Sequence, residues 1–238
     1  MKAIYLLILL LALLLPLGCV PAETPGLTPG VVPPTPAKPR TISLPEPRLK
    51  SEVSLEETLL KRRSVREYGD IPLTLEEVSQ LLWAAQGITS EWGGRTAPSA
   101  GALYPLEVYV AAGSVESLSV GVYKYKPERH QLVKVRDGDV RGELAEAALS
   151  QAWVKESAIN IVIAAVYERT TRKYGERGVR YVHMEAGHAA QNIYLQATAL
   201  NLGAVTVGAF HDDQVKEIMD MSENETPLYV IPVGRKGS

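Results

Sequence analysis

Two short segments of this sequence combine residue types that could bind a planar ligand carrying a phosphate group. The first, residues 96–105, reads TAPSAGALYP, and positions 98–102 carry almost no side-chain bulk. A backbone without bulk can lie flat against a ring system, and Gly101 can adopt φ values that other residues avoid. We therefore interpret this segment as one wall of a ligand site.

The second segment, KRRSVR at 61–66, gathers four cations and one hydroxyl group within six residues. Arg62, Ser64 and Arg66 could form a phosphate site, because guanidinium groups offer paired donors that match phosphate oxygens. Cations at the end of a helix also interact favourably with the helix dipole without any ligand. The sequence by itself leaves both interpretations open.

Two further places could take part in chemistry. In AVTVGAF, at 204–210, the small residues Gly208 and Ala209 would let a ring approach the backbone N–H groups. Lys173 and Tyr174 are neighbours in the charged stretch RTTRKYGERGVR. By its composition this stretch is typical of an exposed, charged segment, although a lysine whose pKa is lowered by burial can act as a base.

The histidines do not indicate a metal site. Glu185 and His188 are three residues apart on a predicted helix, where their side chains could pair across one turn. The spacing H-x-E-x-x-H differs from the H-E-x-x-H pattern of zinc enzymes, and no third ligand is evident. We expect His211 to cap the helix that follows it.

Helices and strands alternate without a regular βαβ order, which favours the α+β class. The capping-box pattern S/T-x-x-E at Ser54 and Thr74 predicts the start of two helices, and Gly87 the end of the second. Small residues at 186–190 could serve either the core of one chain or a dimer contact. We expect strands at 106–112, 120–125, 132–135, 158–166, 204–210 and 228–233, and further helices at 139–150, 179–202 and 212–221.

The composition excludes some classes of partner. The 238 residues are 46% hydrophobic and 22% charged, which is typical of globular proteins. The net charge is −2 and the cations are scattered, so nothing indicates nucleic-acid binding. Cys19 is the only cysteine, which excludes an internal disulfide and a cysteine-based metal site.

The N-terminal part is expected to be a leader and a linker. The apolar run in 1–18 is shorter than the roughly 20 residues of a membrane-spanning helix and is typical of a signal peptide. Cys19 lies where a lipoprotein signal has its lipidated cysteine, although Pro16 departs from that pattern. Residues 19–50 hold nine of the sixteen prolines and predict an extended linker. We expect 51–238 to fold outside the cytoplasm, attached to the membrane by lipid or an uncleaved anchor, or else secreted.

Several motifs then occur in a fixed order across 51–238: RRSVREY, PLTLEEVSQLLWAAQGIT, APSAGALYPLEVYV, KYGERGVRYVHMEAGHAAQN, GAVTVGAF and PVGR. This ordered set resembles the nitroreductase superfamily and, more narrowly, its SagB-type dehydrogenases, which include the azoline oxidases of thiazole and oxazole biosynthesis. The resemblance implies a central, mostly antiparallel sheet flanked by helices. It also implies an intertwined homodimer that binds two FMN molecules at its interface, each contacted by both subunits.

The resemblance assigns cofactor contacts to particular residues. It places the FMN phosphate on Arg62, Ser64 and Arg66, with Arg235 as a further contact. Ala102 stands where typical nitroreductases have an asparagine that contacts the ring, so that contact is replaced or absent. The positions expected along the flavin and its ribityl chain, or facing flavin N5 and O4, are Pro98, Ser99, Ala100, Gly101, Ala102, Leu103, Tyr104, Gly208 and Ala209.

The resemblance also implies an activity. Lys173 and Tyr174 match a Lys-Tyr dipeptide of the azoline oxidases, which is thought to remove a proton while hydride leaves for the flavin. We expect an FMN-dependent oxidoreductase that transfers hydride between a small organic substrate and FMN. One alternative is an NAD(P)H-dependent nitro- or quinone reductase. With no G-x-G-x-x-G after a strand, NAD(P)H would have to stack directly on the flavin. Another alternative is a membrane-tethered flavin-binding protein without turnover.

Overall fold

The structure, a computed structural model, describes residues 41–237 of the chain. Its eight-stranded sheet has the order β1-β5-β4-β3-β6-β8-β2, and β7 pairs with β8 off this path. All these strand pairings are antiparallel, which confirms the mostly antiparallel sheet that the family resemblance implied. The strands are β1 (Thr41–Ser43), β2 (Tyr68–Gly69), β3 (Leu106–Ala112), β4 (Gly121–Lys126), β5 (Gln131–Asp137), β6 (Ile159–Ala165), β7 (Leu202–Ala204) and β8 (Thr226–Lys236).

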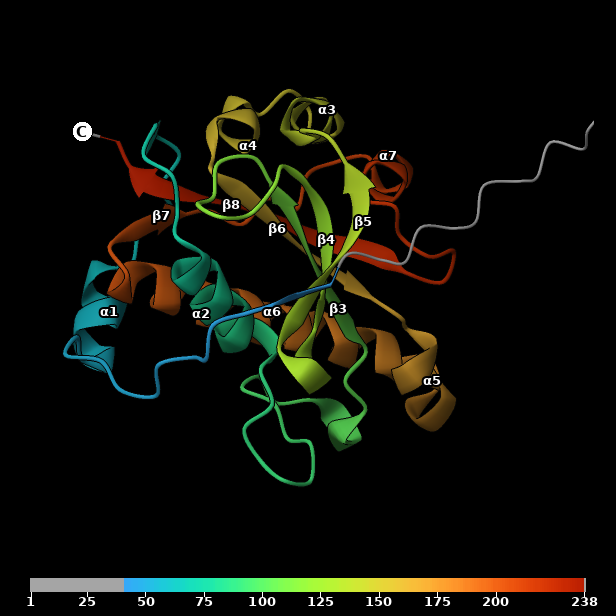
Figure 1. Cartoon of the computed structure of the whole chain (residues 1–238). Coiled ribbons are helices and arrows are strands. Elements are labelled where there is room, and N and C mark those ends of the chain that lie inside the picture. Colours follow the sequence, from blue (N-terminus) through green and yellow to red (C-terminus); the bar gives the residue numbers. More distant parts are fainter. Residues whose placement is uncertain (1–40, 238) are drawn as a thin grey trace, which may run out of the picture. The chain divides into compact units, whose positions relative to one another are not determined.

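Helices cover both faces of this sheet (Figure 1). Helices α2 and α6 pack on one face, and α3, α4 and α7 pack on the other. Both predicted capping positions hold, because the side chains of Ser54 and Thr74 accept hydrogen bonds from the first turns of α1 and α2. The helices are α1 (Leu55–Lys61), α2 (Leu75–Gln86), α3 (Arg141–Ala147), α4 (Ala152–Glu156), α5 (Glu168–Tyr174), α6 (Arg177–Ala199) and α7 (Asp212–Ile218), with 3-10 turns η1 (Ala100–Ala102) and η2 (Pro127–Arg129).

The central strands are buried on both faces, which explains their nearly continuous apolar sequence. All seven residues of β6 are buried. In the adjacent β3, Val108 and Val110 join the core beneath α2 and α6, whereas Tyr109 and Ala111 join the core beneath α3, α4 and α7. Successive residues of a strand point to opposite faces, so two covered faces require apolar residues at every position.

Small residues of α6 serve the core of this chain. Ala186, Ala189 and Ala190 are buried among the residues that α6 shares with the sheet. Gly187 differs, because no described atom lies within 4 Å of the position that a Cβ would take there. Only this fourth small residue leaves room for an approaching partner.

The predicted boundary between linker and fold, at residue 50, was wrong. Strand β1 pairs with β5, so the folded unit already includes residue 41. The Pro45 carbonyl oxygen lies 3.0 Å from Nε2 of His130, and the Ser79 hydroxyl donates to the same carbonyl at 2.5 Å. The stretch 41–50 was hidden from sequence analysis because it is short and rich in proline.

The predicted strand 204–210 was also wrong in its length. Strand β7 ends at Ala204, and Val207 beyond it makes only an isolated bridge to Val230. The partner strand β8 has Pro232 between these two contacts. A proline has no N–H to donate, so the ladder is interrupted there and the segment after β7 leaves the sheet.

The proposed leader at 1–18, the lipidation site Cys19 and residues 20–40 lie outside the described residues. Within 41–237, the structure has no helix of sufficient length and apolar character to cross a membrane.

Candidate active site

The loop at 99–104 concentrates left-handed backbone. Gly101, Ala102 and Tyr104 have φ values of +64°, +53° and +45°. For residues other than glycine such values cost on the order of 1–3 kcal/mol and persist only where the surroundings enforce them. Ser99 supplies that constraint, because its carbonyl accepts from the N–H of Ala102 at 3.1 Å and its hydroxyl from the N–H of Tyr104 at 2.9 Å. Backbone strain of this kind clusters at ligand sites.

The predicted catalytic pair lies against this loop. Lys173 and Tyr174 form the C-terminal end of α5. A Cβ added to Gly101 would lie 2.9 Å from Nζ of Lys173 and 2.7 Å from the Tyr174 hydroxyl. The amine and the phenol therefore converge on one backbone position, which only glycine leaves open. An edge-on contact with Tyr181, at 5.2 Å between ring centroids, further fixes the ring of Tyr174.

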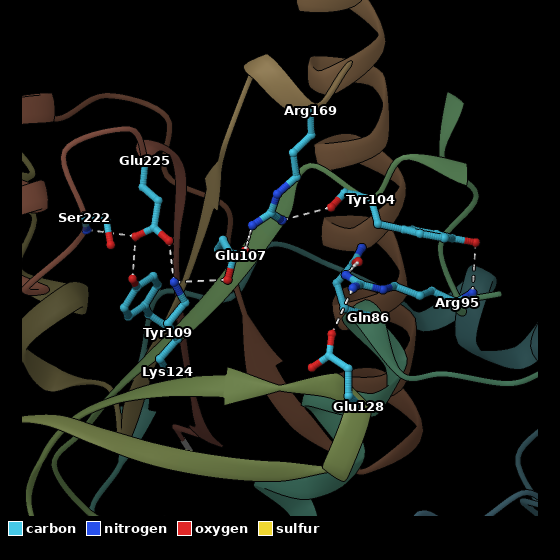
Figure 2. A network of polar contacts seen from close by, with 10 residues as sticks. All are labelled: Gln86, Arg95, Tyr104, Glu107, Tyr109, Lys124, Glu128, Arg169, Ser222 and Glu225. Atoms are coloured by element: carbon cyan, nitrogen blue, oxygen red, sulfur yellow. Dashed lines mark hydrogen bonds and ion pairs between the residues drawn. The ribbon is translucent and has the colours of Figure 1, made fainter. Parts of the chain in front are cut away.

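A polar network fixes the loop to α5 and to the sheet (Figure 2). Arg169, in the first turn of α5, donates to the Tyr104 carbonyl at 3.1 Å and forms an ion pair with Glu107 of β3. Lys124 of β4 bridges onward from Glu107, at 3.1 Å, to the buried Glu225. The loop and the helix that carries Lys173 therefore share one anchor.

Glu225 closes this network at its buried end. It accepts hydrogen bonds from the Tyr109 hydroxyl at 2.5 Å, from the N–H of Ser222 at 3.0 Å and from Lys124. Burial alone would raise the pKa of Glu225, but these donors outweigh it and hold the pKa below its ordinary value. Burial and the carboxylate together raise the pKa of Tyr109, so this phenol stays protonated. The anchor is therefore ionic at neutral pH.

Tyr104 supports the loop from behind. Its ring lies 4.7 Å from the guanidinium carbon of Arg95, and its hydroxyl accepts from the Arg95 N–H at 3.2 Å. Arg95 in turn donates to the Gln86 side chain of α2 at 2.9 Å. A polar cavity of about 280 Å³ lies beside these residues and is also lined by Glu128 and Arg169. Tyr104, which was predicted to line the ligand site, thus has one face of its ring against Arg95.

The predicted phosphate site is partly assembled around one tyrosine. The Ser64 hydroxyl lies 3.2 Å from the hydroxyl of Tyr194 on α6, and the Arg62 guanidinium lies over the ring of Tyr194 at 5.2 Å. Arg66 lies over the ring of Trp153 instead, at 5.4 Å. The exposed side chain of Arg63 turns back to the carbonyls of Leu60 and Arg62. Three of the four cations at 61–66 thus have different surroundings.

Tyr194 is a residue that the sequence reasoning missed. In addition to its contacts with Ser64 and Arg62, Tyr194 accepts a hydrogen bond on its hydroxyl from the N–H of Thr206 at 2.8 Å. It therefore joins the cations to the segment that continues to Gly208 and Ala209, which are both exposed. Nothing in its local sequence distinguishes it from a core tyrosine, since its partners lie 130 and 12 residues away.

Arg235 does not join this group through its guanidinium. It forms a two-pronged ion pair with Glu77 of α2, with N–O distances of 2.6 and 2.9 Å. A bidentate pair of this kind uses both outer nitrogens of the guanidinium. Arg235 therefore already has an internal partner at the position expected to contact phosphate.

Glu185 and His188 do not pair across their turn of α6. Glu185 is 2% exposed, whereas His188 is exposed to solvent. His211 does occupy the N-cap position of α7, but its side chain makes no capping hydrogen bond. Within residues 41–237 no cluster of three or more histidine, cysteine, aspartate or glutamate side chains could hold a metal ion.

Helix α6 relates the two groups of candidate residues. Glu185 lies near Ser99 of the loop, and Tyr194 lies beside Arg62 and Ser64. These two positions are nine residues apart, or about 14 Å along the helix axis at 1.5 Å per residue. The small-residue loop and the residues Arg62 and Ser64 therefore lie beside two different positions of the same helix.

Comparison with known proteins places the chain in a family. A protein of Methanocaldococcus jannaschii that is named as a nitroreductase is 57% identical over 185 residues, 78% of this chain and 92% of its own length. A solved structure from Ralstonia eutropha, also named as a nitroreductase, matches with a TM-score of 0.74 at 34% identity, over 84% of this chain and 90% of that one. The NADPH-flavin oxidoreductase of Vibrio harveyi is 25% identical over 186 residues, 75% of this chain and 64% of that protein.

These similarities confirm the nitroreductase-like fold that the ordered motifs implied. The family model described as the nitroreductase family matches residues 59–235, which is most of the chain and nearly all of its described part. Every candidate residue from Arg62 to Arg235 and the helices α2 to α7 lie within that range, as does the sheet except for β1 and the last residue of β8. The chain therefore belongs to the nitroreductase family.

Proposed function

We propose that this protein is an FMN-dependent oxidoreductase of the SagB dehydrogenase type, which transfers hydride between a small organic substrate and bound FMN. The observation that carries the proposal is the convergence of the Lys173 amine and the Tyr174 phenol on Gly101. Proton-carrying groups at a strained, exposed loop form an arrangement suited to acid–base chemistry next to a bound ligand. Family membership and the flavin named for the Vibrio harveyi relative support the cofactor.

The described residues fit FMN in most respects. Gly101 and Ala102 are exposed and without bulk, so a ring can approach their backbone. Arg62 and Arg66 have no carboxylate partner among residues 41–237, which leaves both charges for a phosphate group. Arg235 fits less well, because Glu77 already holds it. We therefore propose that Arg62, Ser64 and Arg66 hold the phosphate without Arg235.

The chemistry follows from these positions. Bound FMN supplies an acceptor or donor for hydride. Lys173 and Tyr174 would hold or remove a proton of the substrate while the substrate bond that releases hydride breaks. The amine of Lys173 would act as the base. The N–H groups of Gly208 and Ala209, which are exposed, would donate toward the ring where charge develops.

Lys173 is exposed in the single chain. We also propose that two chains form the homodimer that the family resemblance implies. The α1 residues Leu55, Leu59 and Leu60 are 59%, 53% and 74% exposed, an apolar face that a partner would cover. Sedimentation of the folded unit should therefore give twice the mass of the chain, and a monomer at micromolar concentration would contradict the dimer.

A second candidate function is an NAD(P)H-dependent nitro- or quinone reductase, which the name of the Vibrio harveyi relative favours. Anaerobic titration of the FMN-loaded protein with NADH and NADPH separates the two functions. Rapid bleaching of the flavin absorption by either nucleotide supports the reductase. Persistence of the bands, with bleaching by an azoline or amine substrate, supports the dehydrogenase. A protein that binds FMN but reacts with none of these would be a flavin-binding protein without turnover.

The catalytic roles are tested by Lys173→Ala and Tyr174→Phe, with Arg172→Ala as a matched control. Arg172 is the exposed cation that precedes the pair on α5. Loss of either catalytic group should lower turnover by roughly 100-fold or more with FMN binding retained. Turnover equal to that of Arg172→Ala would contradict the assignment.

For the residues outside the described range, we propose that 1–18 directs export and that Cys19 carries a lipid anchor. The sequence pattern at Gly18-Cys19 supports this. Cys19→Ser should move the protein from the membrane fraction to the soluble extracytoplasmic fraction, and an unchanged membrane fraction would favour an uncleaved anchor.

A further inference from the structure

One buried carboxyl group beneath the loop has no role in the mechanism above. Glu185, in the middle of α6, is 2% exposed, and its Oε1 has no hydrogen-bond partner among residues 41–237. Buried carboxyl oxygens are normally paired, because an unpaired one costs a large part of its hydration energy. A carboxyl group left in this state is suited to holding a proton.

The Ser99 hydroxyl connects Glu185 to the loop. Its oxygen accepts from the N–H of Tyr104 at 2.9 Å, α6 packs against the turn η1 that follows Ser99, and the Ser99 side chain lowers the pKa of the Glu185 carboxyl group. A hydroxyl group has one proton to donate and two lone pairs. When Glu185 is ionised, Ser99 donates to the carboxylate and faces the loop as an acceptor. When Glu185 is protonated, it donates to Ser99, and the serine proton becomes free to face a ligand on the loop.

The charge of Glu185 is finely balanced at neutral pH. Burial raises its pKa to about 7, although the Ser99 hydroxyl and the Arg95 guanidinium both lower it. On its own helix, Tyr181 and the exposed His188 lie about one turn away. From α5, Lys173 reaches the same loop at Gly101. A small change in nearby charge would therefore change the protonation state.

Two carboxylates on elements that pack against α6 are held in ion pairs elsewhere, and Glu76 of α2 and Arg172 of α5 are exposed to solvent. On α2, Glu77 is paired with Arg235, and on β3, Glu107 is paired with Lys124 and Arg169. Strand β6 has no titratable side chain. Within the described part of the chain, Arg95 is thus the charged group that acts on Glu185 most directly.

We propose that Glu185 is a positioning residue which, through the Ser99 hydroxyl, couples its own protonation to the charge of the ligand bound on the loop. This inference rests on the proposed function, since it takes that ligand to be FMN. When negative charge arrives on the ring, Glu185 takes up one proton from solvent, and Ser99 turns its hydroxyl proton toward the ring. When the charge leaves, the proton is released. The O–H bond of Glu185 is the one bond of the protein that forms and breaks in this exchange.

The two-electron midpoint potential of bound FMN reports this coupling directly. It is measured from about pH 6 to about pH 9, on both sides of the Glu185 pKa, in the FMN-loaded wild type and in Glu185→Gln. Above neutral pH the wild type should take up one proton more than the variant for each pair of electrons. One extra proton is a tenfold effect per pH unit, or about 30 mV per unit for a two-electron couple. If Glu185 had only a structural role, its replacement would change the stability of the protein but not this slope of midpoint potential against pH.

Glu128→Gln is the matched control. Glu128 also lies near Arg95, at 3.5 Å, but its side chain is 64% exposed and does not contact Ser99. This control should keep the steeper slope of the wild type. Equal slopes in the wild type and Glu185→Gln, with FMN bound to both, would overturn the inference and leave the proposed function intact.

Ser99→Ala is the second variant, and it keeps the test decisive if Glu185→Gln does not fold. It leaves the carboxyl group in place but removes the connecting hydroxyl, so the extra slope should disappear. Retention of the full slope in Ser99→Ala would overturn the role of Ser99. A wild type that does not bind FMN at all would overturn both the inference and the proposed function, and is thereby distinguished from failure of the coupling alone.

Discussion

The phosphate site can be tested by comparing two ligands that differ only in the phosphate group. We expect Arg62→Ala to weaken the binding of FMN while leaving riboflavin nearly unaffected. A hydrogen bond to a charged group contributes roughly 1.5–3 kcal/mol. At about 1.4 kcal/mol for each factor of ten, removing one such contact should raise the Kd for FMN by roughly 10- to 150-fold. Any general effect on folding, including the lost contact with Tyr194, acts on both ligands and cancels in the comparison.

Arg63→Ala provides the matched control for this experiment. Arg63 is the adjacent residue and carries the same charge, but its guanidinium donates to the Leu60 and Arg62 carbonyls at 3.0 and 2.7 Å. It should therefore change the FMN affinity by less than about threefold, as an exposed charge some distance from the phosphate does. Both affinities are measured by fluorescence titration at fixed salt.

Two results would refute this reasoning. Equal weakening of FMN and riboflavin by Arg62→Ala would mean that Arg62 shapes the protein and does not contact phosphate. Equal weakening of FMN by Arg62→Ala and Arg63→Ala would indicate a diffuse positive field in place of a defined site.

Three further changes test other parts of the structure. Gly101→Ala places a Cβ 2.7 and 2.9 Å from the two catalytic groups, about 0.6–0.8 Å inside an ordinary contact of about 3.5 Å. Turnover should fall by about 100-fold with FMN retained, whereas Gly138→Ala, at φ +94° and with open space around it, should change stability only. Glu225→Gln should lower the free energy of unfolding in urea by about 3 kcal/mol, because it breaks a buried ionic anchor. Folding lowers the pKa of Glu225, so its contribution to stability is complete above its ordinary pKa of about 4.3 and is lost as the pH falls below that value. A wild-type free energy of unfolding that stays constant on acidification would contradict this, and so would equal free energies of unfolding in the wild type and Glu225→Gln. Tyr194→Phe should weaken FMN binding several-fold by releasing Ser64, and unchanged affinity would mean that Tyr194 has only a packing role.

Sequence patterns predicted those parts of the fold that depend on local chemistry. The capping boxes at Ser54 and Thr74 depend on contacts within four residues, and the structure contains both. Strand β3 was predicted with its observed bounds, because a run of apolar residues follows directly from burial on two faces. The end of β7 was not predicted, because it depends on Pro232 of a different strand.

In the candidate site, too, the features that depend on local sequence could be predicted and those that depend on distant residues could not. The small-residue loop and the cations at 61–66 could be identified from residue types alone. The partners of Tyr194, the ion pair of Arg235 with Glu77 and the burial of Glu185 could not, since each depends on residues distant in the sequence. The sequence showed only that Glu185 could pair with His188 one turn away, whereas in the folded chain its neighbours are Ser99 and Arg95, which are distant in the sequence.

The most direct test of the central claim is the visible absorption spectrum of the protein, purified and then reconstituted with FMN and passed over a desalting column. We expect the bands of an oxidised flavin at about one FMN per chain, retained through the column. A protein that stays colourless after reconstitution, although folded by circular dichroism, would contradict the account.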